Sequence, residues 1–214
     1  MTEQRLITWD STLRSFLREA GSAAPTPGGG SVSALVGALG AAMTSMVGRL
    51  SEGEKYIAIR PLVTEVLNVM EQLSAQCETL LMEDIESFER YMQALRLPKA
   101  TEEEKEIRMQ ALQQAAEAAA QVPVRILEAC RDGIRSAARL AEASNKSVVS
   151  DLGIGAILFE SAAQSALLTI EINLAALQDA EFKERVAGRA SALIREITAV
   201  KEETLVAVRQ RIIG

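Results

Sequence analysis

Residues 24–48 read APTPGGGSVSALVGALGAAMTSMVG and carry no charged side chain. Pro25 and Pro27 restrict the backbone and disfavour a helix ahead of the glycines. The three glycines at 28–30 can adopt conformations closed to other residues, and they leave room for a close approach. Ser31 is a favourable helix N-cap, so the sequence predicts a helix that starts there.

The glycine segment has two interpretations. A glycine-rich turn that leads into a helix exposes unpaired amide N–H groups and the positive end of the helix dipole, which together can bind a carboxylate or a phosphate. The pattern lacks the Gly-Lys-Ser/Thr ending of a Walker motif, and no strand precedes it as in a dinucleotide fingerprint. A tight turn before a buried helix explains the same residues equally well.

The helix predicted after Ser31 consists largely of Gly, Ala and Ser. With about 18 uncharged residues it is long enough to cross a bilayer. However, it lacks the aromatic belt of a membrane span and lies among charged amphipathic segments. We therefore expect no membrane insertion and a central helix buried on all sides. A second apolar helix, residues 152–177, is interrupted only by Glu160 and Glu171 and follows a polar segment at 143–151.

The rest of the chain shows helical periodicity and none of the alternation typical of strands. Apolar stripes predict four further helices, at residues 5–19 (with Leu6 and Trp9), 61–95, 102–143 and 181–213. We expect the helix at 102–143 to be a solvated outer helix with a break near Pro123. The sequence thus predicts an all-α fold, one domain over residues 1–214, in which about six helices form a bundle around two buried central helices. Small residues on those helices and a surplus of apolar surface favour a homodimer.

The composition excludes several classes of function. The formal net charge is −6 and there is no basic run, which argues against nucleic acid as the partner. Two cysteines, Cys77 and Cys130, and an N-terminus unlike a signal peptide indicate reduced thiols in a cytoplasmic protein. Histidine is absent, so acid–base chemistry must use Asp, Glu, Lys, Tyr or Cys, and the commonest zinc ligand is missing.

Asp84 falls in the core-facing stripe between Leu80 and Phe88. An ionised carboxylate there is costly unless it is paired or its pKa rises. A raised pKa would suit an acid or base near neutral pH, whereas a capped or paired structural aspartate is the alternative. Asp151 likewise either caps its helix or lies inside it as a functional group. Lys55 and Tyr56, in a polar break, could serve chemistry or be ordinary surface residues.

The string Pro-Thr-Pro-Gly-Gly-Gly-Ser at 25–31, followed by the Ala/Gly/Ser helix, resembles the opening of the formimidoyltetrahydrofolate cyclodeaminase family. That family includes the cyclodeaminase half of formiminotransferase-cyclodeaminase and stand-alone methenyltetrahydrofolate cyclohydrolases. The resemblance covers nearly the whole chain and includes Lys55-Tyr56, Asp84 with Phe88, Leu97-Pro98-Lys99, the segment 145–153 and Ile172-Asn173-Leu174. The chain departs from the family at Ser144-Asn145-Lys146-Ser147-Val148, where members often have Gly-Asn-x-Asn-Ala, and at Glu171, where a basic residue is usual.

The resemblance implies an all-helical dimer with a folate site in a cleft near the subunit interface. It implies conversion of 5-formimidoyltetrahydrofolate to 5,10-methenyltetrahydrofolate with release of ammonia, without a metal or another cofactor. We expect Asp151 to do acid–base work and Asp84 to be its partner or to stabilise the cation. Lys55 and Tyr56 are expected nearby, and the substrate is expected to contact Pro27, Gly28, Gly29, Gly30, Ser31, Asn145 and Ser150.

Two alternatives stay open at this point. Methenyltetrahydrofolate cyclohydrolase activity uses almost the same chemistry with water in place of ammonia. A non-catalytic helical dimerisation module would use the glycine helix only as a dimer seam. Only an enzyme of either kind requires Asp84, Asp151 and Lys55 to converge around a cavity lined by residues 28–31.

Overall fold

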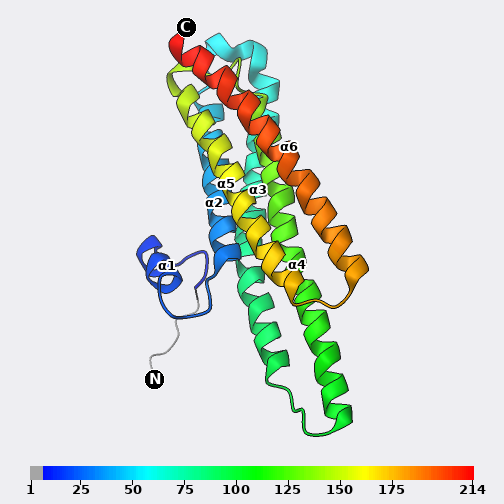
Figure 1. Ribbon diagram of the computed structural model, residues 1–214. Helices are drawn as coiled ribbons and strands as arrows, with labels where there is room; N and C mark the ends of the chain where they lie inside the picture. The colour runs from blue at the N-terminus through cyan, green and yellow to red at the C-terminus, as the bar shows by residue number, and fades with distance from the viewer. Residues whose placement is uncertain (1–6) are drawn as a thin grey trace.

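The computed structural model describes residues 7–214 and shows a bundle of long helices (Figure 1). Within that range there are six α-helices, two short 3-10 helices and no strand, which confirms the predicted all-α fold. The helices are α1 (Leu13–Ala20), α2 (Gly29–Arg49), α3 (Arg60–Leu95), α4 (Glu102–Ala138), α5 (Val149–Ala175) and α6 (Ala180–Ile213), with 3-10 helices η1 (Glu54–Ile59) and η2 (Lys146–Val148).

Helices α2 and α5 pack side by side and run antiparallel (Figure 1). The prediction that the first of them is buried on all sides is wrong within one chain, because Val32 and Leu39 of α2 are exposed, as are Leu168 and Ile172 of α5. Helix α2 also packs on α3, while α4 packs on α3, α5 and α6. Small residues make this close packing feasible, since a Cβ atom at Gly133 of α4 would come within 2.5 Å of the Phe159 ring of α5. Phe159 is fully buried at this crossing, so glycine provides the space for the largest core side chain.

Two helical segments are long and apolar enough to cross a membrane by length and composition, namely Gly29–Arg49 and Lys146–Ala175. In the bundle, 56% of the most apolar window of the first and 44% of that of the second is buried. Both segments also contribute residues to the buried core, and the predicted absence of membrane insertion stays a prediction.

The predicted first helix is wrong over its first half. Helix α1 begins only at Leu13, because the Thr12 side chain caps it by accepting a hydrogen bond from the Ser15 amide at 3.1 Å. Trp9 lies in a turn ahead of that cap, and Leu6 lies outside the described residues. Thr12 is a strong local stop signal that the apolar periodicity alone does not reveal.

Helix α4 corrects the prediction of a broken, solvated outer helix. It continues through Pro123 and ends at Ala138, five residues before the predicted end. Its second half is core, with residues such as Ala120, Ile126 and Ile134 fully buried. Alanine suits both surface and tightly packed positions, which is why its abundance misled the prediction.

The two cysteines face the core. Cys77 of α3 and Cys130 of α4 are free and buried, and a Cβ atom at Gly37 of α2 would touch both sulfur atoms. Burial raises the pKa of Cys77 to about 12. These thiols are therefore poor nucleophiles and act as packing groups.

Candidate functional site

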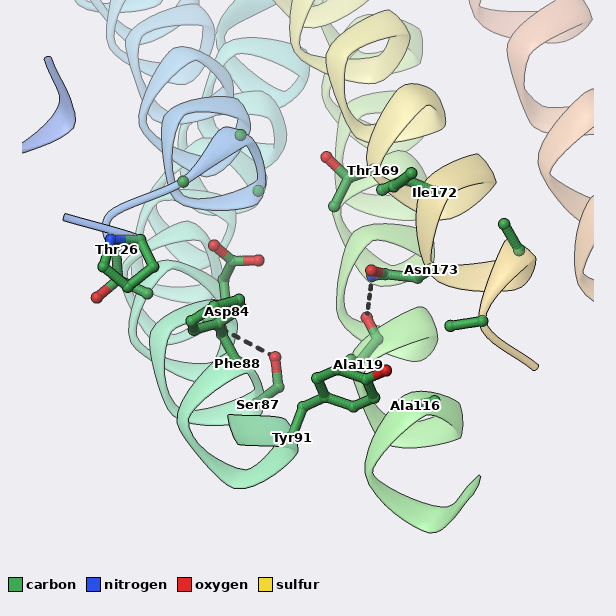
Figure 2. Close-up of a pocket in the computed structure, with 16 residues that line it drawn as sticks. Thr26, Asp84, Ser87, Phe88, Tyr91, Ala116, Ala119, Thr169, Ile172 and Asn173 are labelled. Carbon is green, nitrogen blue, oxygen red and sulfur yellow. Dashed lines mark hydrogen bonds between the residues drawn. The ribbon is translucent and has the colours of Figure 1, made fainter. Parts of the chain in front are cut away.

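A cavity of about 620 Å³ lies where the glycine turn (residues 25–30) meets α3, α4 and α5 (Figure 2). One carboxylate, Asp84 of α3, lines it. The other lining residues are polar or apolar without charge: Pro25, Thr26, Gly28, Gly29, Gly30, Ser87, Phe88, Tyr91, Ala116, Ala119, Thr169, Ile172, Asn173, Ala175 and Ala176. The cavity is thus mostly apolar with a few polar groups, which is the usual character of a small-molecule site.

Asp84 is tied to the first turn of α2 through one of its two oxygens. The Ser31 amide donates to Oδ2 at 2.8 Å and the Ser31 hydroxyl donates to the same atom at 2.7 Å. Burial raises the pKa of Asp84, while the two hydrogen bonds from Ser31 oppose that rise. Asp84 thus has features of both predicted alternatives: burial raises its pKa, and it is hydrogen-bonded as a capping aspartate would be.

The helix start differs from the prediction in a way that explains the three glycines. Gly28, not Ser31, is the N-cap residue of α2, and no side chain of the turn caps the helix. Asp84, which belongs to α3, caps α2 instead. Its carboxylate therefore lies at the positive end of the α2 dipole. A Cβ atom at Gly30 would lie 2.1 Å from Oδ1 of Asp84, so only glycine admits the carboxylate there.

The predicted anion site is therefore partly occupied by the protein itself. The Ser31 amide is used by Asp84, whereas the amides of Gly29 and Gly30 donate to no acceptor within residues 7–214. Oδ1 of Asp84 likewise accepts no hydrogen bond from the described part of the chain, yet it is not a buried atom. These amides and this oxygen are the groups left to meet a ligand.

The cavity walls carry two aromatic side chains, Phe88 and Tyr91, one turn apart on α3 (Figure 2). Across from them on α5, the Asn173 side chain donates to the carbonyl of Ala119 at 3.0 Å. That bond fixes the amide, so the Asn173 carbonyl oxygen is held in place as an acceptor. A flat, aromatic, largely neutral group bearing hydrogen-bond donors matches these walls.

Most of the cavity wall was not predicted from the sequence. Phe88 was placed only in the apolar stripe and the family resemblance, and Tyr91 was not singled out, although both follow Asp84 on the same helix face, at spacings of four and seven residues. Asn173 had no signal beyond the family resemblance. Thr169 lies one turn before it on α5 and lines the same cavity.

The remaining predicted site residues come from η1, from the residue ahead of η2 and from the first turn of α5, and we call them the second cluster: Lys55, Tyr56, Asn145, Ser150 and Asp151. This cluster lies at the opposite end of α2, where the Asn145 amide donates to Ser51 Oγ at 2.8 Å just past the helix. Asp84, by contrast, is bonded to Ser31 in the first turn. The 20 residues between Ser31 and Ser51 span roughly 30 Å of helix at 1.5 Å per residue. Asp84 therefore does not converge with Asp151 and Lys55 within one chain, and their convergence across a dimer stays a prediction.

The second cluster is an open surface. Lys55 Nζ lies 4.8 Å from the centre of the Tyr56 ring, and Lys55 is exposed. The Asn145 side chain is committed, because it donates to the Leu50 carbonyl at 2.9 Å and accepts from the Ser147 amide at 3.1 Å. Ser150 is exposed, and Asp151 is half-buried in the first turn of α5.

Comparison with known proteins gives one family model and several relatives. The formiminotransferase-cyclodeaminase family model matches residues 12–192. Methenyltetrahydrofolate cyclohydrolase of Methylorubrum extorquens is 34% identical over 204 residues, which cover 95% of this chain and 98% of that protein. Formimidoyltransferase-cyclodeaminase of Rattus norvegicus is 36% identical over 91% of this chain, which spans only 36% of the rat protein.

A solved structure agrees with these matches. The crystal structure of formiminotetrahydrofolate cyclodeaminase from Thermotoga maritima superposes with a TM-score of 0.85 at 26% sequence identity. The superposition covers 94% of this chain and 97% of the other. The bundle described above is therefore similar to that enzyme along almost its entire length.

Proposed function

The chain belongs to the formiminotransferase-cyclodeaminase family, and on this premise we propose that its cavity beside Asp84 binds a tetrahydrofolate derivative. The chain is a folate one-carbon enzyme. We assign it conversion of 5-formimidoyltetrahydrofolate to 5,10-methenyltetrahydrofolate with release of ammonia. One observation carries the assignment: a carboxyl group of raised pKa faces a cavity of about 620 Å³ that no other charged side chain of residues 7–214 lines.

The cavity suits the ring end of a folate. Its walls offer Phe88 and Tyr91 for contact with a flat ring, and Asp84 with Asn173 as acceptors for ring N–H groups. Among its lining residues there is no Lys or Arg. A substrate's carboxylate tail would therefore lie unpaired beside Asp84, so we place the tail outside the cavity.

Asp84 can carry the one proton that must move in this reaction. N10 attacks the carbon of the cationic formimidoyl group and forms the new C–N bond, and the amine then leaves as ammonia when its C–N bond breaks. The proton lost from N10 equals the proton gained by the departing amine, so a single carboxylate can accept it and then donate it. The positive charge of the substrate remains on the methenyl product, and no net proton is needed.

The environment of Asp84 fits that role. Burial raises its pKa, which makes the carboxylate a stronger base than an exposed aspartate. After donating the proton, the carboxylate is again negative and stabilises the methenyl cation. This proposal moves the acid–base role expected of Asp151 to Asp84, which lies in the cavity.

The second candidate is methenyltetrahydrofolate cyclohydrolase activity. Here water adds to the methenyl carbon, one C–N bond breaks, and a formyl derivative and a proton are released. The coverage of 98% of the Methylorubrum cyclohydrolase by this chain favours this candidate, since the match leaves almost no part of that protein unaccounted for. Asp84 would then act as the base for water.

We further propose that the enzyme is a homodimer whose seam is formed by α2 and α5. The outward face of α2 carries apolar residues in a repeat of seven, Val32, Val36, Leu39, Met43, Met46 and Leu50, each half-buried or exposed. The outward face of α5 adds the exposed residues Ile154, Ile157, Leu168 and Ile172. Exposed apolar stripes on two adjacent helices are more favourably covered by a second copy of the chain than by water.

Whether the second cluster can reach the partner's Asp84 cavity depends on whether the two α2 helices of the dimer run parallel or antiparallel. A two-fold axis perpendicular to α2 would place the C-terminal end of the partner's α2 beside the N-terminal end of this one. Ile172 lies both on the exposed stripe and at the cavity, so the cavity opens beside the seam. An antiparallel dimer can therefore bring the partner's second cluster, which includes Lys55 and Asp151, to the Asp84 cavity, whereas a parallel dimer cannot.

The assignment is tested by absorbance assays with 5-formimidoyl- and 5,10-methenyltetrahydrofolate in parallel. Turnover of the first substrate supports the cyclodeaminase, and turnover of only the second identifies the cyclohydrolase. Turnover of neither favours a non-catalytic dimerisation module. Cytoplasmic location, independence of any cofactor or metal, and absence of nucleic-acid and membrane partners belong to the same proposal and rest on the sequence.

A further inference from the structure

Helix α1 exposes a pair of leucines that no other part of residues 7–214 covers. It stands to the side of the bundle (Figure 1), held there by Phe16, which is buried. Leu13 and Leu17 lie one turn apart on α1, and they are 66% and 61% exposed. A short helix of eight residues gains little stability by itself, so an uncovered leucine pair on it indicates a missing partner surface.

A matching surface lies at the other end of α2. There, a groove of about 610 Å³ separates the C-terminal half of α2 from α3. Its apolar residues are Ala42, Met46, Leu50, Leu67 and Met70. The groove is thus apolar along its floor and wide enough for side chains of an added helix.

We propose that α1 of one protomer docks with Leu13 and Leu17 in the α2–α3 groove of its partner. The inference rests on the antiparallel homodimer argued above, because only that arrangement places α1 beside the partner's groove. Within one chain, Ala42 lies 13 residues along α2 from its first residue, Gly29, or roughly 20 Å at 1.5 Å per residue. Met46 and Leu50 belong both to the groove and to the α2 stripe, so the groove continues the proposed seam.

Charge can fix the direction of docking. The groove is lined by one charged residue of each sign, Arg49 and Glu71. Arg14 is exposed on α1 beside the leucine pair. Neither Arg14 nor Glu71 forms an ion pair within residues 7–214. When α1 docks, Arg14 and Glu71 can lie at the same edge of the groove. Their attraction then favours one orientation of α1.

Cross-linking tests the contact directly. The chain with Leu17→Cys and Ala42→Cys is oxidised and analysed by denaturing gel electrophoresis without reductant, and we expect a covalent dimer. The native thiols do not interfere, because Cys77 and Cys130 are buried. The matched control carries Leu17→Cys with Met109→Cys, an exposed position on α4, and should remain monomeric on the gel.

Three results would overturn the inference. These are an intrachain Leu17–Ala42 cross-link, a covalent dimer from Leu17→Cys alone, and no cross-link from the pair although ultracentrifugation shows a dimer. The last result leaves the proposed function intact, since folate turnover and the dimer are measured separately on the same sample. As a second measurement, Leu13→Ser with Leu17→Ser should raise the dimer dissociation constant on the order of 100-fold or more. An unchanged constant would contradict the docking.

Discussion

Ser31 donates two hydrogen bonds, from its amide and its hydroxyl, to the same oxygen of Asp84, a residue 53 positions away in the chain. The pair joins the start of α2 to the middle of α3. It holds Oδ2 of Asp84 and leaves Oδ1 free of hydrogen bonds within the described residues. Because Oδ2 is the better satisfied atom, the proposed mechanism assigns uptake and release of the proton to Oδ1. In that mechanism Ser31, predicted to bind substrate, instead holds the carboxylate in position.

Replacing Ser31 by alanine should raise the pKa of Asp84 further. The hydroxyl bond favours the ionised carboxylate, and its loss leaves burial less opposed. The acid limb of the kcat/KM profile should therefore move to higher pH, with a stability loss of about 1–3 kcal/mol. Ser31→Thr, which keeps the hydroxyl, should restore the wild-type profile. An acid limb that stays in place in Ser31→Ala would contradict a role for this hydrogen bond.

Gly30→Ala should displace the Asp84 carboxylate and abolish most of the activity. The new Cβ atom would lie 2.1 Å from Oδ1, and relieving that overlap costs about 1–3 kcal/mol. Gly188→Ala is the matched control, because a Cβ atom there meets nothing within 4 Å. In a helix that change should instead stabilise the protein by about 0.5–1 kcal/mol. Thermal unfolding and turnover of both variants separate the two effects, and equal activity would show that the glycine is dispensable.

The stability of the protein should depend on pH through Asp84. Burial raises the pKa of this carboxyl in the folded state, so its contribution is fully present below the unfolded pKa and is lost as pH rises through the folded pKa. Asp84→Asn cannot ionise. The free energy of unfolding of the wild type should therefore fall relative to the variant between acid and neutral pH in urea titrations. The opposite trend would mean that the carboxylate is stabilised on folding.

Mixed dimers test whether the partner supplies the second cluster. Asp151→Asn and Asp84→Asn should each form dimers of low activity when pure. If Asp151 acts in the partner's cavity, a mixed dimer has one site with both aspartates intact, so random mixing should restore about a quarter of wild-type activity. No recovery, in a mixture shown to exchange subunits, would mean that Asp151 does not contribute across the seam.

The fold could be predicted from the sequence because a helix is indicated by local features, namely apolar periodicity and composition. The uncharged run from Ala24 to Gly48 predicts a central helix, and helix α2 is that helix. The helix predicted from residue 102 begins at Glu102, where Thr101 and Glu104 form a capping box. Trp9 and Pro123 misled the prediction, since an apolar stripe does not reveal a capping threonine, and a proline can be accommodated within a long packed helix.

The site was only partly predictable. The turn at residues 28–30 and the inward position of Asp84 could be inferred from residue types, and they do meet at one cavity. The bond between Ser31 and Asp84 depends on how α2 and α3 pack, which no local pattern records. The distance between Asp84 and Asp151 depends on the length and direction of α2 and, in the proposed homodimer, on a second chain, so local sequence patterns cannot supply it.

The proposed mechanism depends above all on Asp84 as the group that moves the proton. The most direct test compares wild type, Asp84→Asn and the exposed-site control Asp10→Asn in single-turnover and binding assays with both folate substrates. Asp84→Asn should lose on the order of 10²–10⁴ in kcat, while its dissociation constant for substrate changes only a few-fold and Asp10→Asn behaves as wild type. Near-normal turnover by Asp84→Asn, with the variant folded and dimeric, would contradict the mechanism.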